Sequence, residues 1–237
     1  MPANTSDWNY QRDVLNRPVG QDARPPASEA GTEEVFYWLF LPADYGRQAA
    51  AEGAPLVLSL HGAGSRGSEP AKVMRHGMAK LLEEPAWAAA YPAVVVSPQC
   101  KAGARWSPRQ LLALLDEVEK ELKINKSRVY VTGLSLGGFG TWMLLAEAPG
   151  RFAAAAPICG GGKTEWAGRM SGVPIWVFHG DADTKVPIGR SVEMVEALKK
   201  AGARQVVLTI YKGGGHDVFT RTYANPLFHD WLLSQRK

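Results

Sequence analysis

The sequence predicts an α/β protein with a mainly parallel sheet that is covered by helices on both faces. Segments with strand character alternate along the chain with segments of helical periodicity, which is typical of parallel strands joined by helices. Residues 93–97 are apolar up to the last position, as expected for a strand that is buried on both sides. The 237 residues suffice for one large domain with a sizeable core.

Seven segments are predicted to be strands because β-branched, aromatic and aliphatic residues dominate them and turn residues bound them. The first is rich in aromatic residues and is closed by Pro42 and Gly46. The fourth leads into a glycine-rich turn. The predicted strands are 34–41, 55–60, 93–97, 128–132, 152–158, 175–178 and 205–211.

The clearest predicted helix follows Ser107, which has the position of an N-cap, with Pro108 first in the helix and Gln110 at the capping-box position. Apolar residues then recur at helical spacing at Leu111, Leu114, Leu115, Val118 and Leu122. Further helices are predicted at about 74–82 (inside an excursion of residues 65–92), 137–147, 192–198 with its end at Gly202, and 226–235.

The composition excludes several classes of protein. Apolar residues make up 46% and charged residues 21% of the chain, which is ordinary for a globular protein. The net charge of +4 is spread along the chain without a basic cluster, so we expect no nucleic-acid partner. No apolar run approaches the roughly 18 residues of a membrane span, and the two cysteines lack metal-site spacing.

Residues 1–32 are predicted to form an N-terminal arm, because they lack periodicity and contain turn-rich stretches at 24–26 and 28–31. Residues 33–237 are then a single domain. The arm is polar and contains prolines, without the apolar core of a secretory signal. We expect either a cytoplasmic protein or an exported one whose signal peptide is missing from this sequence, and the sequence does not decide between them.

The central motif is Gly133-Leu134-Ser135-Leu136-Gly137, between a predicted strand and a predicted helix. A serine on a sharp strand-to-helix turn needs neighbours without a Cβ, because strand and helix would otherwise collide. Such a turn lifts the hydroxyl above the carboxyl edge of the sheet and places the next amide at a helix N-terminus. This context favours Ser135 as a nucleophile over a chance Gly-Ser-Gly turn.

A serine nucleophile needs a base within hydrogen-bonding distance and a carboxylate that orients the base. His216 follows the last predicted strand after three glycines at 213–215, which leave the imidazole free to reach the sheet edge. We therefore predict His216 as the base rather than a solvated loop histidine. The other histidines are assigned to structure: a surface position for His76, helix packing for His229, and loop bracing by hydrogen bonds for His61 and His179.

The loop at 179–187 offers two carboxylates, Asp181 and Asp183. We predict Asp183 as the orienting acid, because it stands further into the loop that must reach His216. The order Ser135, Asp183, His216 along the chain is that of the α/β-hydrolase arrangement and differs from both main serine-protease orders.

Two backbone amides are predicted to bind the oxyanion. One is the Leu136 N–H, directly after the nucleophile. The second should come from the loop His61-Gly62-Ala63-Gly64 after the strand at 55–60, where the Ala63 N–H is the expected donor rather than part of a plain glycine turn. Removing one such donor typically costs about 2.7–4 kcal/mol of transition-state stabilisation.

Five segments together resemble the small α/β-hydrolase serine esterases, and more closely their phospholipase/carboxylesterase and dienelactone-hydrolase-like branch, often labelled predicted peptidase. They are 60–67, 97–100, 131–142, 157–162 and 179–187, and the resemblance runs from about Phe36 to the C-terminus. It implies nucleophile, acid and base at Ser135, Asp183 and His216. Many relatives have methionine in place of Leu136, a change that leaves the amide in place. Short loops predict the α/β-hydrolase fold without a large cap domain.

Cys100 and Cys159 follow strands that the usual strand order of this fold separates by two central strands. Adjacent strands lie about 4.8 Å apart, so three steps give roughly 14 Å. A disulfide requires Cα atoms within about 7 Å. We predict two separate thiols, neither of them catalytic, with Cys159 packing near the loop of Asp183.

The resulting prediction is a carboxylic ester hydrolase, with residues 33–237 as its catalytic domain, that works through an acyl-enzyme and needs no metal or organic cofactor. Alternatives are a serine peptidase or feruloyl-type esterase on the same scaffold, and more remotely an inactive binding module, against which the intact Ser, Asp and His argue.

The predicted substrate is a small-molecule ester or an exposed polymer-linked ester, because short loops without a cap leave the site open. Trp106, Trp166 and Phe219 are candidates for an apolar substrate wall, weighed evenly against packing roles. The natural ester and the oligomeric state stay open.

Overall fold

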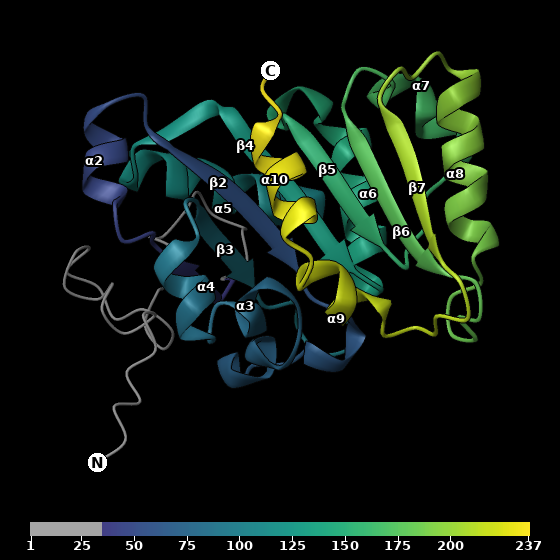
Figure 1. The fold of residues 1–237 in the computed structure, drawn as a ribbon, viewed down its shortest axis with the longest axis horizontal. Helices are drawn as coiled ribbons and strands as arrows, with labels where there is room; N and C mark the ends of the chain where they lie inside the picture. The colour runs from purple at the N-terminus through teal and green to yellow at the C-terminus, as the bar shows by residue number, and fades with distance from the viewer. Residues whose placement is uncertain (1–34) are drawn as a thin grey trace.

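One sheet of seven strands organises the fold, with the strands in the order β1-β3-β2-β4-β5-β6-β7. A computed structural model describes residues 35–237 (Figure 1). The predicted arm at 1–32 lies outside the described residues, so the boundary between arm and domain stays a prediction.

All seven predicted strands occur, with shifts of a few residues at their ends. They are β1 (Tyr37–Phe40), β2 (Ala54–Leu60), β3 (Val94–Pro98), β4 (Ile124–Leu134), β5 (Ala154–Ile158), β6 (Ile175–Gly180) and β7 (Val206–Tyr211). Strand β1 is antiparallel to β3, and the other neighbouring pairs are parallel. The prediction of a mainly parallel sheet is confirmed.

The largest difference concerns the start of β4, which begins at Ile124 rather than at residue 128. Polar residues at 125–127 hide this start in the sequence. Ile124 pairs with Ala54, and the register then shifts before Val129 pairs with Leu56. The irregular first half of β4 explains why only the apolar second half was predicted.

The helices include all the predicted ones and several short ones that were not predicted. They are α2 (Tyr45–Ala50), α3 (Gly77–Leu81), α4 (Pro85–Ala90), α5 (Pro108–Glu121), α6 (Leu136–Glu147), α7 (Ala167–Met170), α8 (Gly189–Lys200), α9 (Val218–Tyr223) and α10 (Pro226–Ser234). Helices α2, α4, α7 and α9 have four to six residues, too few to show a helical period. The helix predicted at 74–82 is shorter, because the extended backbone of His76 separates a 3₁₀ turn from α3.

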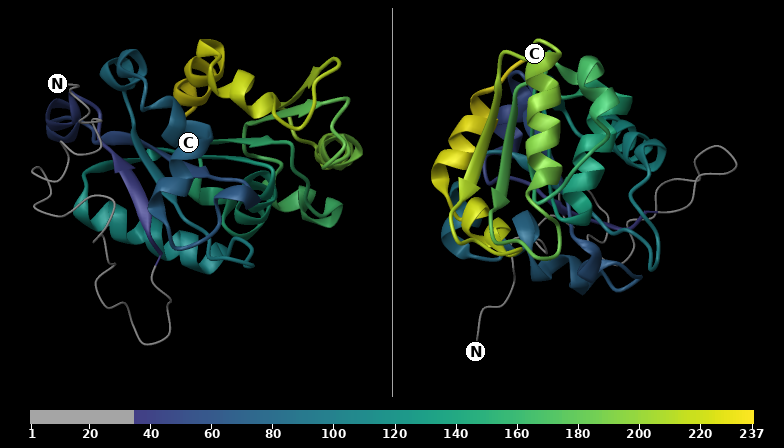
Figure 2. Two further views of the ribbon diagram at one scale, coloured as in Figure 1. Left: turned by 90° about the horizontal axis from the view of Figure 1, so that it is seen from below. Right: turned by 90° about the vertical axis from the view of Figure 1, so that its right-hand side faces the viewer.

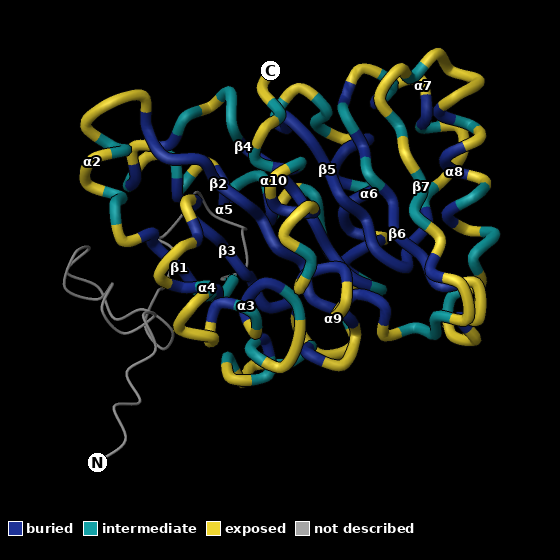
Figure 3. The backbone as a smooth tube through the Cα atoms, viewed as in Figure 1, coloured by how far each residue is buried: buried dark blue, intermediate teal, exposed yellow. Residues whose placement is uncertain are grey.

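Helices cover both faces of the sheet, as predicted (Figures 1 and 2). Helices α5, α6, α7 and α8 pack against one face, and α3, α4, α9 and α10 against the other. Along β4 the side chains alternate between the two layers: Val129 and Val131 belong to one, Tyr130 to the other. Figure 3 shows the central strands buried between helices whose outer surfaces are exposed, whereas the edge strand β7 is intermediate to exposed along most of its length.

The carboxyl ends of the parallel strands meet at one edge of the sheet, where the loops that follow β2, β4, β6 and β7 carry the predicted catalytic and oxyanion residues. The excursion between β2 and β3 folds onto the sheet as short helices, and the described residues form no large cap domain. Among the described helices, none combines the length and apolar character needed to cross a bilayer.

Candidate active site

Ser135 occupies the turn between β4 and α6 in a conformation that few residues adopt. Its φ is 54° and its ψ is −115°, and its N–H donates to the Ile158 carbonyl at 2.9 Å. Positive φ in a residue other than glycine costs free energy and persists only where the surroundings enforce it. Because Ser135 lies between the end of β4 and the start of α6, the strand-turn-helix context predicted for it is present.

The glycines beside this turn allow backbone segments to lie so close together that there is no room for a Cβ. A Cβ at Gly133 would collide with the Gly137 carbonyl, and one at Gly137 would collide with the Leu60 carbonyl. The start of α6 thus lies directly against the end of β2, whose following loop holds the predicted oxyanion donor.

The structure brings Ser135, His216 and Asp183 into one line of hydrogen bonds. His216 Nε2 lies 2.9 Å from Ser135 Oγ, and its Nδ1 lies 2.7 Å from Asp183 Oδ2. A neutral imidazole with its proton on Nδ1 donates to the carboxylate and leaves Nε2 to accept from the serine hydroxyl. The arrangement can remove a proton from Ser135.

Asp183 is held ionised by its hydrogen bonds. Burial alone would raise its pKa, but bonds from the Val186 N–H, from His216 and from the Lys185 N–H outweigh burial and lower the pKa. The two N–H groups reach Oδ1 at 2.9 and 2.8 Å, which leaves Oδ2 for His216. Asp181 has a different partner: it accepts from the Gly213 N–H at 2.6 Å, in the loop that leads to His216.

The two predicted oxyanion donors belong to segments next to Ser135. The Leu136 N–H is the first of α6, and the first N–H groups of a helix have no acceptor inside it. For the second donor, a Cβ built at Gly62 would stand 3.5 Å from the Ser135 Cβ, so the loop that contains the Ala63 N–H is adjacent to the serine.

His61 orients this loop as a neutral imidazole. Burial lowers its pKa to about 4, opposed by its bond to Gly62 and assisted by the nearby Arg66 charge. The Cys100 N–H donates to Nε2 at 3.0 Å, so the proton is on Nδ1, which donates to the Gly62 carbonyl at 2.6 Å. The predicted bracing role of His61 is confirmed.

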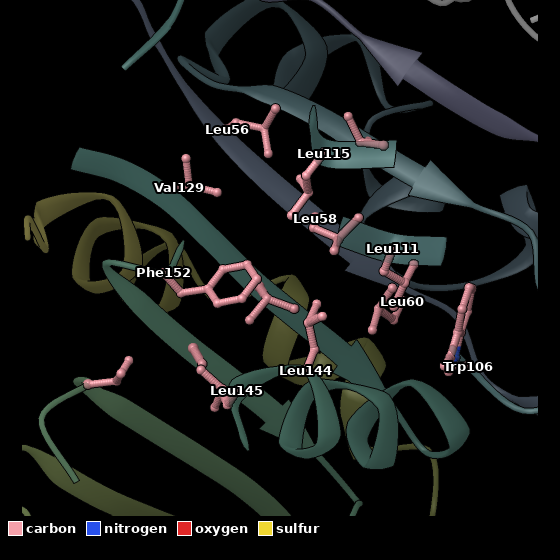
Figure 4. Packing of buried hydrophobic residues seen from close by; sticks show 14 of the residues in the cluster. Leu56, Leu58, Leu60, Trp106, Leu111, Leu115, Val129, Leu144, Leu145 and Phe152 are labelled. Atoms are coloured by element: carbon pink, nitrogen blue, oxygen red, sulfur yellow. The ribbon is translucent and has the colours of Figure 1, made fainter. Parts of the chain in front are cut away.

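Trp106 contacts the same loop through His61. Its Nε1 donates to the His61 carbonyl at 3.3 Å, and its ring lies 4.8 Å from the imidazole of His61. The side chain is buried among apolar residues that include Leu60 and Leu111 (Figure 4). Trp106 therefore packs against the loop.

Of the other two predicted substrate-wall residues, Phe219 lies beside His216. Its ring centroid is 6.3 Å from that of His216, edge to face, and 5.5 Å from that of His76. Trp166 is partly buried against the core, with Lys163 Nζ 5.6 Å from its ring. The substrate-binding role of all three stays a prediction. His76 is exposed, as predicted. Its contact with the ring of Phe219 could not be predicted from the sequence.

Two further histidines have the structural roles predicted for them. His179 contacts the Ser191 hydroxyl at 2.7 Å through Nδ1 and the Val186 carbonyl at 2.8 Å through Nε2. It thereby holds the loop of Asp183. His229 is buried in α10, where its Nε2 lies 2.7 Å from the Tyr223 carbonyl.

Both cysteines are free and buried, as predicted. Cys100 follows β3 and Cys159 follows β5, and strands β2 and β4 lie between these two in the sheet. Cys159 is also close to the Asp183 loop, which confirms that part of the prediction.

The fold and this site together define a class of protein. A mostly parallel seven-stranded sheet, a serine on a strained strand-to-helix turn, and a histidine after the last strand are the features of the α/β-hydrolase fold. Comparison with known sequences specifies the family: the chain belongs to the dienelactone hydrolase family, whose sequence pattern matches residues 100–226.

Individual relatives agree with this placement. NocK of Nocardia uniformis subsp. tsuyamanensis, a protein named as an esterase, is 28% identical over 90% of this chain and 72% of its own length. A bifunctional acetylxylan esterase/xylanase of Neocallimastix patriciarum, XynS20E, is 28% identical over 59% of this chain. The crystal structure of a thermostable esterase superposes with a TM-score of 0.71 and 32% identity over 89% of this chain. The chain spans 21% of XynS20E and 61% of the thermostable esterase.

Proposed function

We propose that this hydrolase cleaves carboxylic esters through an acyl-enzyme on Ser135. The observation that carries the proposal is the line of two hydrogen bonds, 2.9 and 2.7 Å long, that joins Ser135 Oγ through His216 to Asp183. In such an arrangement the imidazole accepts the serine proton, and the carboxylate stabilises the imidazolium that results.

The reaction needs four proton transfers through one imidazole, an uptake and a return in each of its two halves. Ser135 Oγ attacks the carbonyl carbon while its proton moves to His216 Nε2. The ester C–O bond then breaks, and His216 returns the proton to the departing alkoxide. A water molecule then loses a proton to His216 and attacks the acyl carbon. The bond from that carbon to Ser135 Oγ breaks, and His216 returns the proton to Oγ, which releases the acid and restores Ser135.

The negative oxygen of each tetrahedral intermediate needs donors that are in place before the reaction. The amides of Leu136 and Ala63 are proposed for this role. A peptide unit is planar, so the bond from His61 to the Gly62 carbonyl also fixes the direction of the Ala63 N–H, which belongs to the same peptide.

The proposed substrates are small esters and esters exposed on polymers. Phe139 in the first turn of α6 is exposed, and so are Ala63 and Gly64 in the loop next to Ser135, which favours access by an ester on a large molecule. The relative XynS20E is named as an acetylxylan esterase, which favours acetylated polysaccharide as the polymeric candidate.

The test is a panel of p-nitrophenyl esters from acetate to long chains, beside acetylated xylan, a feruloyl ester and a peptide amide. In parallel, a fluorophosphonate reagent is applied and the modified peptide is identified by mass spectrometry. The proposal expects ester turnover and labelling at Ser135. Absence of both would overturn it, and faster cleavage of the amide than of any ester would identify a peptidase instead.

A further inference from the structure

Cys159 stands between the nucleophile and the acid in the sheet. It follows β5, which lies between β4, the strand before Ser135, and β6, the strand before Asp183. Its N–H donates to the Phe178 carbonyl on β6 at 2.9 Å. Its thiol, the His179 imidazole and the Asp183 carboxylate have their polar atoms within 4.8 Å of one another, and all three residues are buried.

The backbone of Cys159 is strained. Its φ is 48°, and Ser135 and Cys159 are the non-glycine residues with positive φ in the described part of the chain. The following three residues are glycines, and glycine at position 159 would adopt this conformation without cost. A side chain in such a strained conformation persists only where its surroundings hold it there.

Its surroundings allow the thiol to act as a hydrogen-bond donor. Burial and the negative charge of Asp183 raise the pKa of the thiol to about 12, so it retains its proton at neutral pH. A buried, protonated thiol is neither a nucleophile nor a ready metal ligand. His179 is already engaged by Ser191 and Val186, and Asp183 by His216.

We propose that Cys159 is a positioning residue for the acid, whose thiol proton is directed at the Asp183 carboxylate and keeps it aligned with His216. This inference rests on the proposed function. Oδ1 is held by two backbone N–H groups, whereas Oδ2 faces His216, with His179 Nε2 at 3.4 Å. The thiol would add a buried donor within 4.8 Å of this carboxylate.

The test compares Cys159→Ala with Cys159→Ser. The alanine variant loses the donor, so kcat should fall about tenfold while KM stays within about twofold. Without the donor the carboxylate charge acts more strongly on His216, so the acidic limb of the kcat/KM profile should move to higher pH. The serine variant retains a donor and should resemble the original protein in both measurements.

A packing control is Val118→Ala, a buried deletion in α5 that should lower Tm and leave the pH profile unchanged. NMR titration of the His216 imidazole in unmodified protein and in Cys159→Ala gives a readout that needs no substrate. If Cys159→Ala is folded and retains both kcat and the His216 titration midpoint, the inference is wrong. Equal losses in the alanine and serine variants would also refute it. Failure of the unmodified protein to hydrolyse any ester would instead count against the proposed function.

Discussion

The Nδ1 atom of His61 lies 2.6 Å from the carbonyl oxygen of Gly62, its own neighbour in the chain. This short bond ties a buried imidazole to the peptide whose N–H we assign to the oxyanion. Replacing His61 by alanine would free that peptide to rotate. We expect His61→Ala to lower kcat by about tenfold or more, below the 10²–10³-fold loss that deletion of a whole donor causes. Steady-state kinetics on a p-nitrophenyl ester measure this, and unchanged kcat in folded protein would contradict it.

His61 also predicts a pH dependence of stability. Its pKa is lowered from 6.5 to about 4 in the folded chain, so the unfolded chain binds more protons between these values. Its contribution is fully present above about pH 6.5 and is lost as the pH falls toward 4, up to about 3 kcal/mol. Denaturant unfolding of the original protein and His61→Gln at pH 7 and 4.5 measures the effect, and the variant should show the shallower loss. Parallel losses in the two proteins would exclude His61 as the cause.

Ser135→Ala should fold normally and lose ester hydrolysis. Removal of a triad nucleophile typically lowers kcat by about a million-fold. Circular dichroism establishes folding, and initial rates with fluorophosphonate labelling establish the loss. A folded variant with more than about a tenth of the original activity would remove Ser135 from its proposed role.

Asp183→Asn and Asp181→Asn separate the two carboxylates of one loop. The first change removes the charge that orients His216, which costs about 10⁴-fold in a well-studied triad. The second leaves an amide oxygen that can still accept from the Gly213 N–H, so we expect a loss within about tenfold. The kcat values decide, and equal impairment would show that the acid is misassigned.

Gly137→Ala should prevent the turn from forming. The added Cβ would overlap the Leu60 carbonyl. That carbonyl belongs to the backbone of the sheet, so it cannot move aside as a flexible side chain could. We expect a loss above about 4 kcal/mol of unfolding free energy, or no soluble protein. Gly150→Ala is the matched control, because no atom lies within 4 Å of its Cβ position and its φ is not positive. Similar stability of the two variants would contradict the close-approach argument.

The strands and the grouping of Ser135, His216 and Asp183 could be predicted from the sequence because each depends on a local sequence pattern. Continuous apolar runs mark buried parallel strands, and glycines that must lack a Cβ mark the turn at Gly133 and Gly137. The catalytic roles remain a proposal, although the geometry agrees with them.

Other features depend on contacts between distant segments and have no local mark. Trp106 packs against His61, 45 residues away, and the sequence could not separate this role from substrate contact. The strain at Cys159 arises where β5 and β6 meet, and its cysteine is not a residue type that indicates positive φ. Short helices such as α9 form because Val218, Phe219 and Tyr223 are buried in the core.

The sheet order has a consequence for how activity is lost on heating. Within the described residues β7 is hydrogen-bonded to β6 alone, and its Val207 and Ile210 are 52% and 50% exposed. The loop that carries His216 follows directly from this edge strand, whereas Ser135 follows a central strand. Edge elements with few buried contacts open at lower free energy than the core. The proposed base should therefore detach while the turn of Ser135 is still intact, so that inactivation precedes the melting of the sheet.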